Sequence, residues 1–107
     1  MDGWRDFNPV PRPKGMRKRA DKACFLNALR VVLRDDTTYS YAEGLAWTKL
    51  GAVHHAWVVD SDGNAIDPTW KEPASGYYGV VFPLSAIKVA GWPTIDDSTI
   101  TEAYGPS

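Results

Sequence analysis

The sequence contains a single cysteine, Cys24, among its 107 residues. A chain with one cysteine cannot form an intramolecular disulfide, so a disulfide-stabilised scaffold is excluded. It also lacks the Cys-x-x-Cys and His-x-x-x-His spacings that are typical of zinc sites. We therefore expect a free thiol and, as the simplest compartment, the reducing cytoplasm.

Long apolar runs are absent as well. No segment approaches the roughly 18 consecutive apolar residues of a membrane-spanning helix, and no membrane association is expected. The opening residues MDGWRDFNPVPRP contain no apolar stretch of the kind found in secretory signals. With 44% hydrophobic and 23% charged residues, the composition is that of an ordinary folded chain of one domain.

The pattern of apolar residues predicts one main helix and a small sheet. Residues 20–34 carry a stripe with the 3.6-residue period of a helix, and Asp21 is its expected N-cap. A short second helix is expected at 83–91. Segments rich in β-branched and aromatic residues predict four strands, at 38–49, 53–60, 64–67 and 77–82. Gly44, within the first of these strands, indicates a bulge or a close approach by another backbone segment. The fold class is therefore α+β, with the N-terminal helix packed on a four-stranded antiparallel sheet.

The ends of the chain are expected to lie outside the catalytic domain at 20–92. Residues 1–19 contain alternating prolines and predict an extended basic arm, not a core element. The first 22 residues carry seven basic and three acidic side chains, whereas the others carry five and ten. We expect a solvated terminus that can also meet an acidic partner, and not a nucleic acid. Residues 93–107 predict an irregular tail.

Cys24 falls in the first turn of the predicted helix. A cysteine attacks as its thiolate, and the partial positive charge at a helix N-terminus stabilises that form. A neighbouring imidazole would add to this effect and later return a proton to a leaving group. A lone cysteine in a helix is, however, more commonly a small buried hydrophobic residue. The assignment of Cys24 as a nucleophile therefore depends on what lies near it.

The hairpin formed by the second and third predicted strands brings a histidine and an aspartate together. A two-residue turn would pair Val58 with Asp67 and place His55 on the opposite face. A three-residue loop with Gly63 in the left-handed conformation instead pairs Trp57 with Asp67. His55 is two residues from Trp57, so it then shares a face with Asp67 as its diagonal neighbour. This register predicts a Cys24–His55–Asp67 triad in which the carboxylate orients the imidazole.

Two alternatives use the adjacent histidine, His54. Strand alternation points its side chain away from Asp67, and only a shift of register would make it the base. A zinc site formed by Cys24, His54 and His55 is disfavoured, because side chains of adjacent strand residues diverge. The expected chemistry uses neither a metal nor another cofactor.

Aromatic residues are the candidate walls of a substrate cleft. The sequence contains five tryptophans, which either anchor a core or line a binding site. Trp47, Tyr39 and Trp70 are the expected substrate-binding residues. Trp57 alternates with apolar neighbours on its strand and is expected to pack in the core.

The run HAWVVDSDGNAIDPTW at 55–70 resembles the His and Asp segments of transglutaminase-like and papain-like cysteine enzymes. CFLNALRVVLR, from Cys24, is similar to their helix, and YSYAEGLA at 39–46 resembles the strand between the two parts. The resemblance covers residues 20–83. It implies a papain-like or transglutaminase-like core and a thioester intermediate, with Cys24 as nucleophile, His55 as base and Asp67 as orienter.

One feature departs from the resemblance. Papain-like enzymes place a glutamine shortly before the cysteine as an oxyanion donor, whereas RKRADKA precedes Cys24 here. The backbone N–H of Cys24 is one expected donor, and the second is unassigned. The resemblance further suggests a small member of bacterial or phage type.

Two functions from different classes fit these patterns. The first is a cysteine-dependent peptidase, amidase or transamidase that acts on a protein, peptide or other amide substrate. The second is a non-catalytic module on the same scaffold that binds or inhibits a partner. The reactivity of the thiol distinguishes them, because a buried inert cysteine alkylates slowly.

Overall fold

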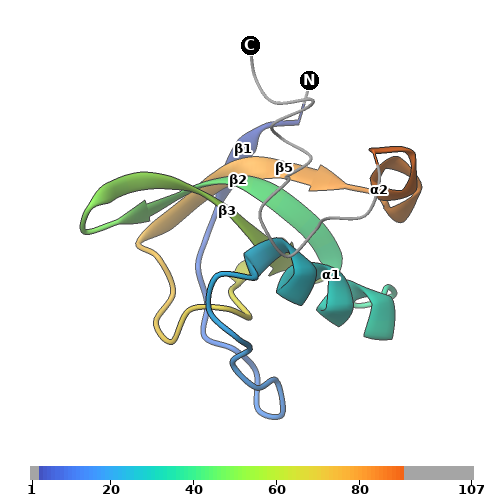
Figure 1. The fold of residues 1–107 in the computed structure, drawn as a ribbon, viewed down its shortest axis with the longest axis horizontal. Coiled ribbons are helices and arrows are strands. Elements are labelled where there is room, and N and C mark those ends of the chain that lie inside the picture. Colours follow the sequence, from blue (N-terminus) through green and yellow to red (C-terminus); the bar gives the residue numbers. More distant parts are fainter. Residues whose placement is uncertain (1–2, 91–107) are drawn as a thin grey trace.

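A computed structural model describes residues 3–90 of the chain, with side chains as far as Ile87. This part contains one antiparallel sheet and two helices (Figure 1). The elements are β1 (Arg5–Phe7), α1 (Cys24–Arg34), β2 (Ser40–Thr48), β3 (Gly51–Val59), β4 (Ala65–Ile66), β5 (Gly76–Phe82) and α2 (Leu84–Ala90). The α+β class is confirmed.

The sheet has five strands in the order β1-β5-β2-β3-β4. The expected four-stranded sheet of a papain-like core is therefore wrong. The four predicted strands are present with shifted ends, and β1 joins the sheet as a fifth, at the edge of β5. Because β2 lies between β3 and β5, the β2–β3 hairpin forms the centre of the sheet, and β4 pairs with the last residues of β3.

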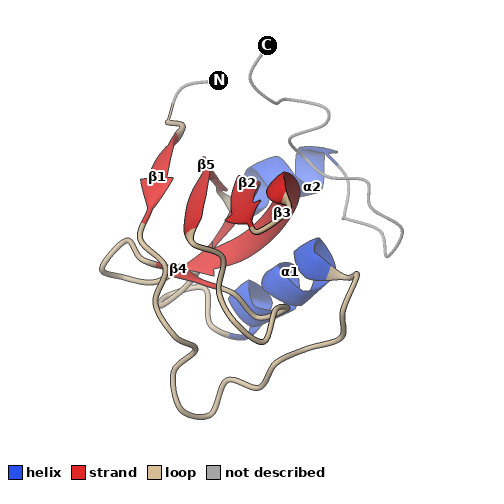
Figure 2. Cartoon of the chain, turned by 90° about the vertical axis from the view of Figure 1, so that its left-hand side faces the viewer, coloured by secondary structure: helices blue, strands red, loops and turns tan. Residues whose placement is uncertain are grey.

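The N-terminal segment is part of the fold. Arg5, Asp6 and Phe7 pair with β5, and the Phe7 side chain is buried beside Trp57. The expectation that the first residues lie outside the core is wrong here, because a buried aromatic side chain on a paired strand contributes directly to packing. Figure 2 shows the long loop from β1 to α1 passing beneath the sheet and α1. Val10 N–H donates to the Ala65 carbonyl at 3.0 Å, which holds this loop against β4.

Helix α1 begins later than the sequence predicts. Its N-cap is Ala23, which makes no side-chain capping bond, and the preceding Lys22 has a φ of 65° that no α-helix contains. The assignment of Asp21 as N-cap is therefore wrong; its carboxylate accepts from Lys18 at 2.9 Å. The consequence is that Cys24 is the first residue of the helix, with the N–H groups of its first turn uncapped by any side chain.

Both faces of the sheet are buried. The apolar stripe of α1 packs with Tyr41, Val58 and Phe82 on one face. The other face carries Phe7, Trp57 and Tyr77, which form a second cluster. Full burial of a large apolar side chain stabilises a fold by roughly 1.5–3 kcal/mol, so the two clusters together hold the strands in register.

Gly44 lies where β2 and β5 approach most closely. A Cβ at this position would lie 2.2 Å from the carbonyl oxygen of Tyr78 and 2.5 Å from Cα of Gly79. The pairing of β2 with both neighbours runs without interruption through Gly44, so the residue marks a close approach and not a bulge.

The described chain ends with α2, which begins one residue later than predicted, at Leu84. The predicted tail at 93–107 lies outside the described residues. Within residues 3–90, neither helix has the length and apolar character needed to cross a membrane.

Candidate active site

The loop between β3 and β4 fixes the register of the site. Gly63 has a φ of 83°, and its N–H donates to the carbonyl of Asp60 at 3.0 Å. Asp60 N–H donates to the Asn64 carbonyl, also at 3.0 Å, which closes a loop of three residues. Val58 then pairs with Ile66, as the predicted register requires. The expected positive φ at Gly63 and the expected register are both confirmed.

This register brings His55 and Asp67 into contact. The Nε2–H of His55 donates to Oδ2 of Asp67 at 2.8 Å. The side chains are only 3% and 2% exposed, so the pair is shielded from water. A carboxylate on one ring nitrogen fixes the tautomer and orientation of the imidazole and leaves the other nitrogen, Nδ1, for proton transfer.

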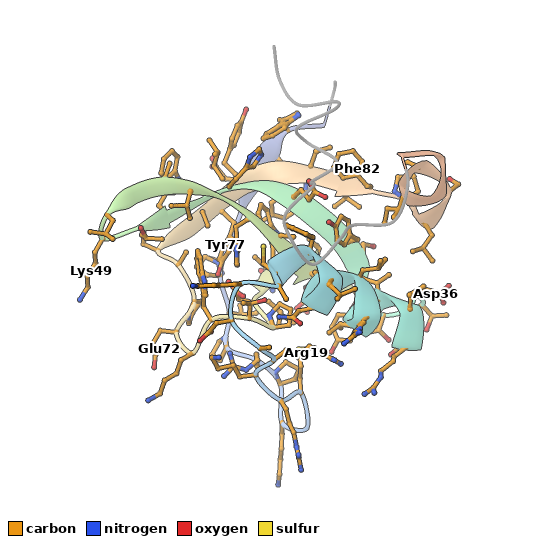
Figure 3. The ribbon with its side chains drawn as sticks, viewed as in Figure 1. Arg19, Asp36, Lys49, Glu72, Tyr77 and Phe82 are labelled. Carbon is orange, nitrogen blue, oxygen red and sulfur yellow. The ribbon has the colours of Figure 1, made fainter. Side chains whose placement is uncertain are left out.

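The Asp67 carboxylate is held by a full set of donors. Oδ1 accepts the backbone N–H groups of Thr69 at 2.9 Å and Trp70 at 3.1 Å. Oδ2 accepts the Tyr77 hydroxyl at 2.7 Å in addition to His55. The Tyr77 hydroxyl in turn accepts the N–H of Ala74 at 2.9 Å. In Figure 3, Tyr77 lies below the ribbon of the strands. With both oxygens engaged, the carboxylate cannot rotate without losing bonds.

Cys24 reaches the same imidazole from the N-terminus of α1. Its side chain is half-buried, and its interaction with the imidazole raises the pKa of His55, after the effects of burial and Asp67. Because Nε2 is engaged by Asp67, Nδ1 is the ring nitrogen left for an interaction with the thiol. The structure therefore brings together all three residues of the predicted triad.

The electrostatics of the site favour a charged imidazole. Burial by itself lowers the pKa of His55, but the hydrogen bonds and charges of Asp67 and Cys24 outweigh it and raise the pKa to about 9. Burial raises the pKa of Asp67, but the hydrogen bond and charge of His55, followed by Tyr77 and Trp70, hold it below its ordinary value. At neutral pH the site thus contains an imidazolium with the Asp67 carboxylate on one side and the Cys24 side chain on the other.

Two polar contacts tie the helix and the loops of the site together. The Asn27 side chain, one turn after Cys24, donates to the Thr69 hydroxyl at 3.0 Å and to the Ala20 carbonyl at 2.8 Å. The Arg12 guanidinium donates to the Trp70 carbonyl at 2.6 Å and, at 3.3 Å, to that of Asp67. The long N-terminal loop therefore holds the segment that carries the orienting carboxylate.

A second buried acid lies near the thiol. The Tyr41 hydroxyl donates to the Glu43 carboxylate, and both side chains are fully buried. Burial, then Glu43 and then Cys24, raises the pKa of Tyr41, so the phenol stays neutral. A neutral, bonded phenol beside the thiol is a structural neighbour of the site, not a second base.

The candidate substrate-binding residues are dispersed. The Trp70 ring stacks on His55, with centroids 3.7 Å apart. Trp57 is buried in the core, as expected. Trp47 covers Gly76, roughly 10 Å along β2 from the residue that faces His55. Tyr39 lines a groove at the other end of α1. Of the three residues, the structure thus brings only Trp70 to the triad.

His54 is exposed, whereas its neighbour His55 is buried. The alternation of β3 separates them as the sequence predicts. Among residues 3–90, no group of three His, Cys, Asp or Glu side chains is arranged to hold a metal ion.

Sequence reasoning missed Tyr77, Asn27 and Arg12. Tyr77 belongs to a predicted strand, but the register of β5 against β2 is set by contacts far apart in the chain. Asn27 did leave a signal, because it is a polar residue three positions after Cys24 within an otherwise apolar stripe.

No family model, curated protein or solved structure matches this chain.

Proposed function

We propose that this chain is a cysteine-dependent acyl-transfer enzyme that acts on an amide or isopeptide bond through a thioester intermediate. The observation that carries the proposal is the contact of three groups: a thiol on the first residue of α1, a buried imidazole, and a carboxylate that holds the other ring nitrogen. The order of these residues along the chain also resembles that of transglutaminase-like and papain-like enzymes.

The proposed reaction has two halves. The Cys24 thiolate attacks the carbonyl carbon, a C–S bond forms, and the C–N bond breaks as the His55 imidazolium gives its proton to the departing amine. Water or a second amine then attacks the thioester, and neutral His55 removes its proton while the thiolate leaves. Attack by water gives hydrolysis or deamidation, and attack by a second amine gives transamidation.

In each half-reaction the negatively charged carbonyl oxygen of the intermediate would lie near the uncapped N-terminus of α1. The first-turn N–H groups have no side-chain acceptor, so the N–H of Cys24 and its neighbours are suitable donors to a developing negative charge. In this arrangement backbone N–H groups donate the hydrogen bonds to the oxyanion, whereas papain-like enzymes use a glutamine side chain for one of them.

The proposal is tested by the rate at which iodoacetamide alkylates Cys24 as a function of pH, followed by intact-protein mass spectrometry. We expect rapid alkylation at pH 6.5 to 7, where an ordinary thiol, with its pKa near 8.5, is mostly protonated. His55→Ala should slow alkylation there by about tenfold or more, because the imidazolium that stabilises the thiolate is lost. Asp67→Ala should have a smaller effect, since it acts through His55.

His54→Ala is the matched control, because it removes an exposed imidazole from the adjacent position. Its alkylation profile should overlay that of the parent protein. If the parent instead follows the profile of an ordinary thiol and His55→Ala leaves it unchanged, the enzyme proposal is wrong and the non-catalytic binding module takes its place.

A further inference from the structure

A basic groove lies beside the C-terminal half of α1. Its volume is about 840 Å³, and it runs between the last turn of the helix and the loop at 13–19. Figure 3 shows Arg19 next to α1, above the part of this loop that hangs below the domain. The cationic residues that line the groove are Lys14, Arg17, Lys18, Arg19 and Arg34.

Most of these cations have no carboxylate partner within residues 3–90. Lys18 pairs with Asp21 at 2.9 Å, and the other ion pair of this part of the chain is that of His55 with Asp67. Asp35 also lines the groove and stays charged, with its carboxylate accepting from the Thr37 hydroxyl at 2.8 Å and the Thr38 N–H at 3.2 Å, so the lining carries five cations against one anion. The groove thus has an excess of positive charge that the described protein does not neutralise.

The positively charged side chains of the groove lie close enough to repel one another. Burial and then the positive charges of Arg34 and Arg30 lower the pKa of Arg19, although an arginine remains charged at neutral pH. Side chains of one sign held together repel each other, and an anion between them would relieve that repulsion. The arrangement therefore favours an anionic occupant.

The loop that lines the groove also contacts the segment that carries Asp67. The backbone N–H of Arg19 donates to the carbonyl of Pro68 at 2.7 Å, directly after Asp67 in the chain. At the other end, Arg34 lies ten residues along α1 from Cys24, or roughly 15 Å. An extended peptide of about four or five residues spans that distance.

The lining favours a peptide over a nucleic acid. Val31 is buried and Met16 and Tyr39 are half-buried in the walls, so apolar side chains lie among the cations. The chain as a whole has a net charge of −1, which does not attract a long polyanion. A short acidic peptide satisfies both conditions.

We infer that this groove binds an acidic polypeptide segment, which would flank the amide that Cys24 attacks. The role as a substrate determinant rests on the proposed function, whereas binding of the acidic segment does not. The groove makes the enzyme selective for amide bonds within a few residues of glutamate or aspartate.

The test is the binding of a fluorescein-labelled hexaglutamate peptide, measured by fluorescence anisotropy at low salt. The parent protein should bind it, and Arg17→Glu with Arg34→Glu should weaken binding by about tenfold. The double variant Lys49→Glu with Lys71→Glu has the same net charge, and both lysines are exposed and outside the groove. It should bind nearly as well as the parent. In Figure 3, Lys49 lies at the far tip of the β2–β3 hairpin.

Three outcomes overturn the inference: no binding by the parent, equal loss in both double variants, or tighter binding of a fluorescein-labelled single-stranded oligothymidine than of hexaglutamate. The last of these would assign the groove to nucleic acid. Cys24→Ala should retain binding, because the thiol does not line the groove. If peptide binding behaves as expected while Cys24 alkylates as an ordinary thiol, only the enzyme proposal fails.

Discussion

His55 and Trp70 lie face to face, with ring centroids 3.7 Å apart and ring planes inclined by 12°. The indole covers one face of an imidazole whose edge is held by Asp67. Stacking of this kind restricts the ring to one orientation and places a charged imidazolium over a π-face, an attraction of about 0.5–2 kcal/mol. Trp70 therefore restrains the orientation of His55.

Removal of the indole should expose the base. In Trp70→Ala we expect diethyl pyrocarbonate, applied at pH 8 where part of the imidazole is neutral, to modify His55 several-fold faster, as followed by peptide mass spectrometry, while Trp70→Phe stays slow because it retains a stacked ring. His54 is exposed in the parent and provides an internal reference rate in every sample. Unchanged protection of His55 in Trp70→Ala would show that the stack is not what shields it.

The raised pKa of His55 makes stability dependent on pH. A histidine whose pKa is higher in the folded state stabilises the fold fully below its unfolded value of 6.5, and this contribution disappears as the pH rises through the folded value, about 9. The difference corresponds to about 3 kcal/mol. The free energy of unfolding in urea should therefore decrease between pH 6.5 and 9.5. His54→Gln should keep that decrease and His55→Gln should lose most of it; a parallel decrease in both would contradict the assignment.

Tyr77 should be a positioning residue for Asp67. Tyr77→Phe removes one donor from the carboxylate and leaves the Ala74 N–H without its acceptor, so we expect a loss of about 1–3 kcal/mol in the free energy of unfolding. At the acidic end of the pH profile, the rise in the alkylation rate of Cys24 should also shift to higher pH, because Asp67 then protonates more readily. The neighbouring substitution Tyr78→Phe, on the opposite face of β5, should change neither quantity by much; equal effects would point to general loosening of the strand.

Gly44→Ala should be severely destabilising. The added Cβ would meet backbone atoms of β5 at 2.2 and 2.5 Å, and backbone cannot move aside as a flexible side chain can. We expect a loss of more than about 3 kcal/mol, seen as a lower urea midpoint or as failure to fold. Ser40→Ala, at the exposed end of the same strand, should stay within about 0.5 kcal/mol. A stable Gly44→Ala protein would mean that β2 and β5 are farther apart.

The contacts that the sequence could predict are local ones. His55 and Asp67 belong to one hairpin, and the loop ending at Gly63 determines which residues share a face. The position of Cys24 in the first turn of a helix is predicted from the apolar stripe together with Asp21 as N-cap, and the turn is correct although the cap is Ala23. Each of these inferences needs only the geometry of a single element or a single turn.

The contacts that it could not predict are those between distant segments. Strand β1 has three residues and no hydrophobic alternation of its own, and it is a strand because β5 presents an open edge. The Tyr77 hydroxyl reaches Asp67 only through the path β5-β2-β3, whose register no local pattern specifies. Aspartate is a residue type that commonly caps helices, so the sequence predicts a start of α1 at Asp21. The left-handed backbone of Lys22 separates Asp21 from the helix, and this conformation depends on no local pattern.

The β3–β4 hairpin has a consequence for biosynthesis. Its His55 and Asp67 are 12 residues apart, while Cys24 precedes both on a separate helix. Synthesis therefore produces the thiol well before His55 and Asp67, and Tyr77 follows all three. Under the proposed function, we expect ribosome-bound chains that end near residue 60 to carry a Cys24 with the reactivity of an ordinary thiol, and faster alkylation to appear only once β5 has left the exit tunnel. A nascent chain of this protein would thus be protected from premature acylation by the order in which its residues are made.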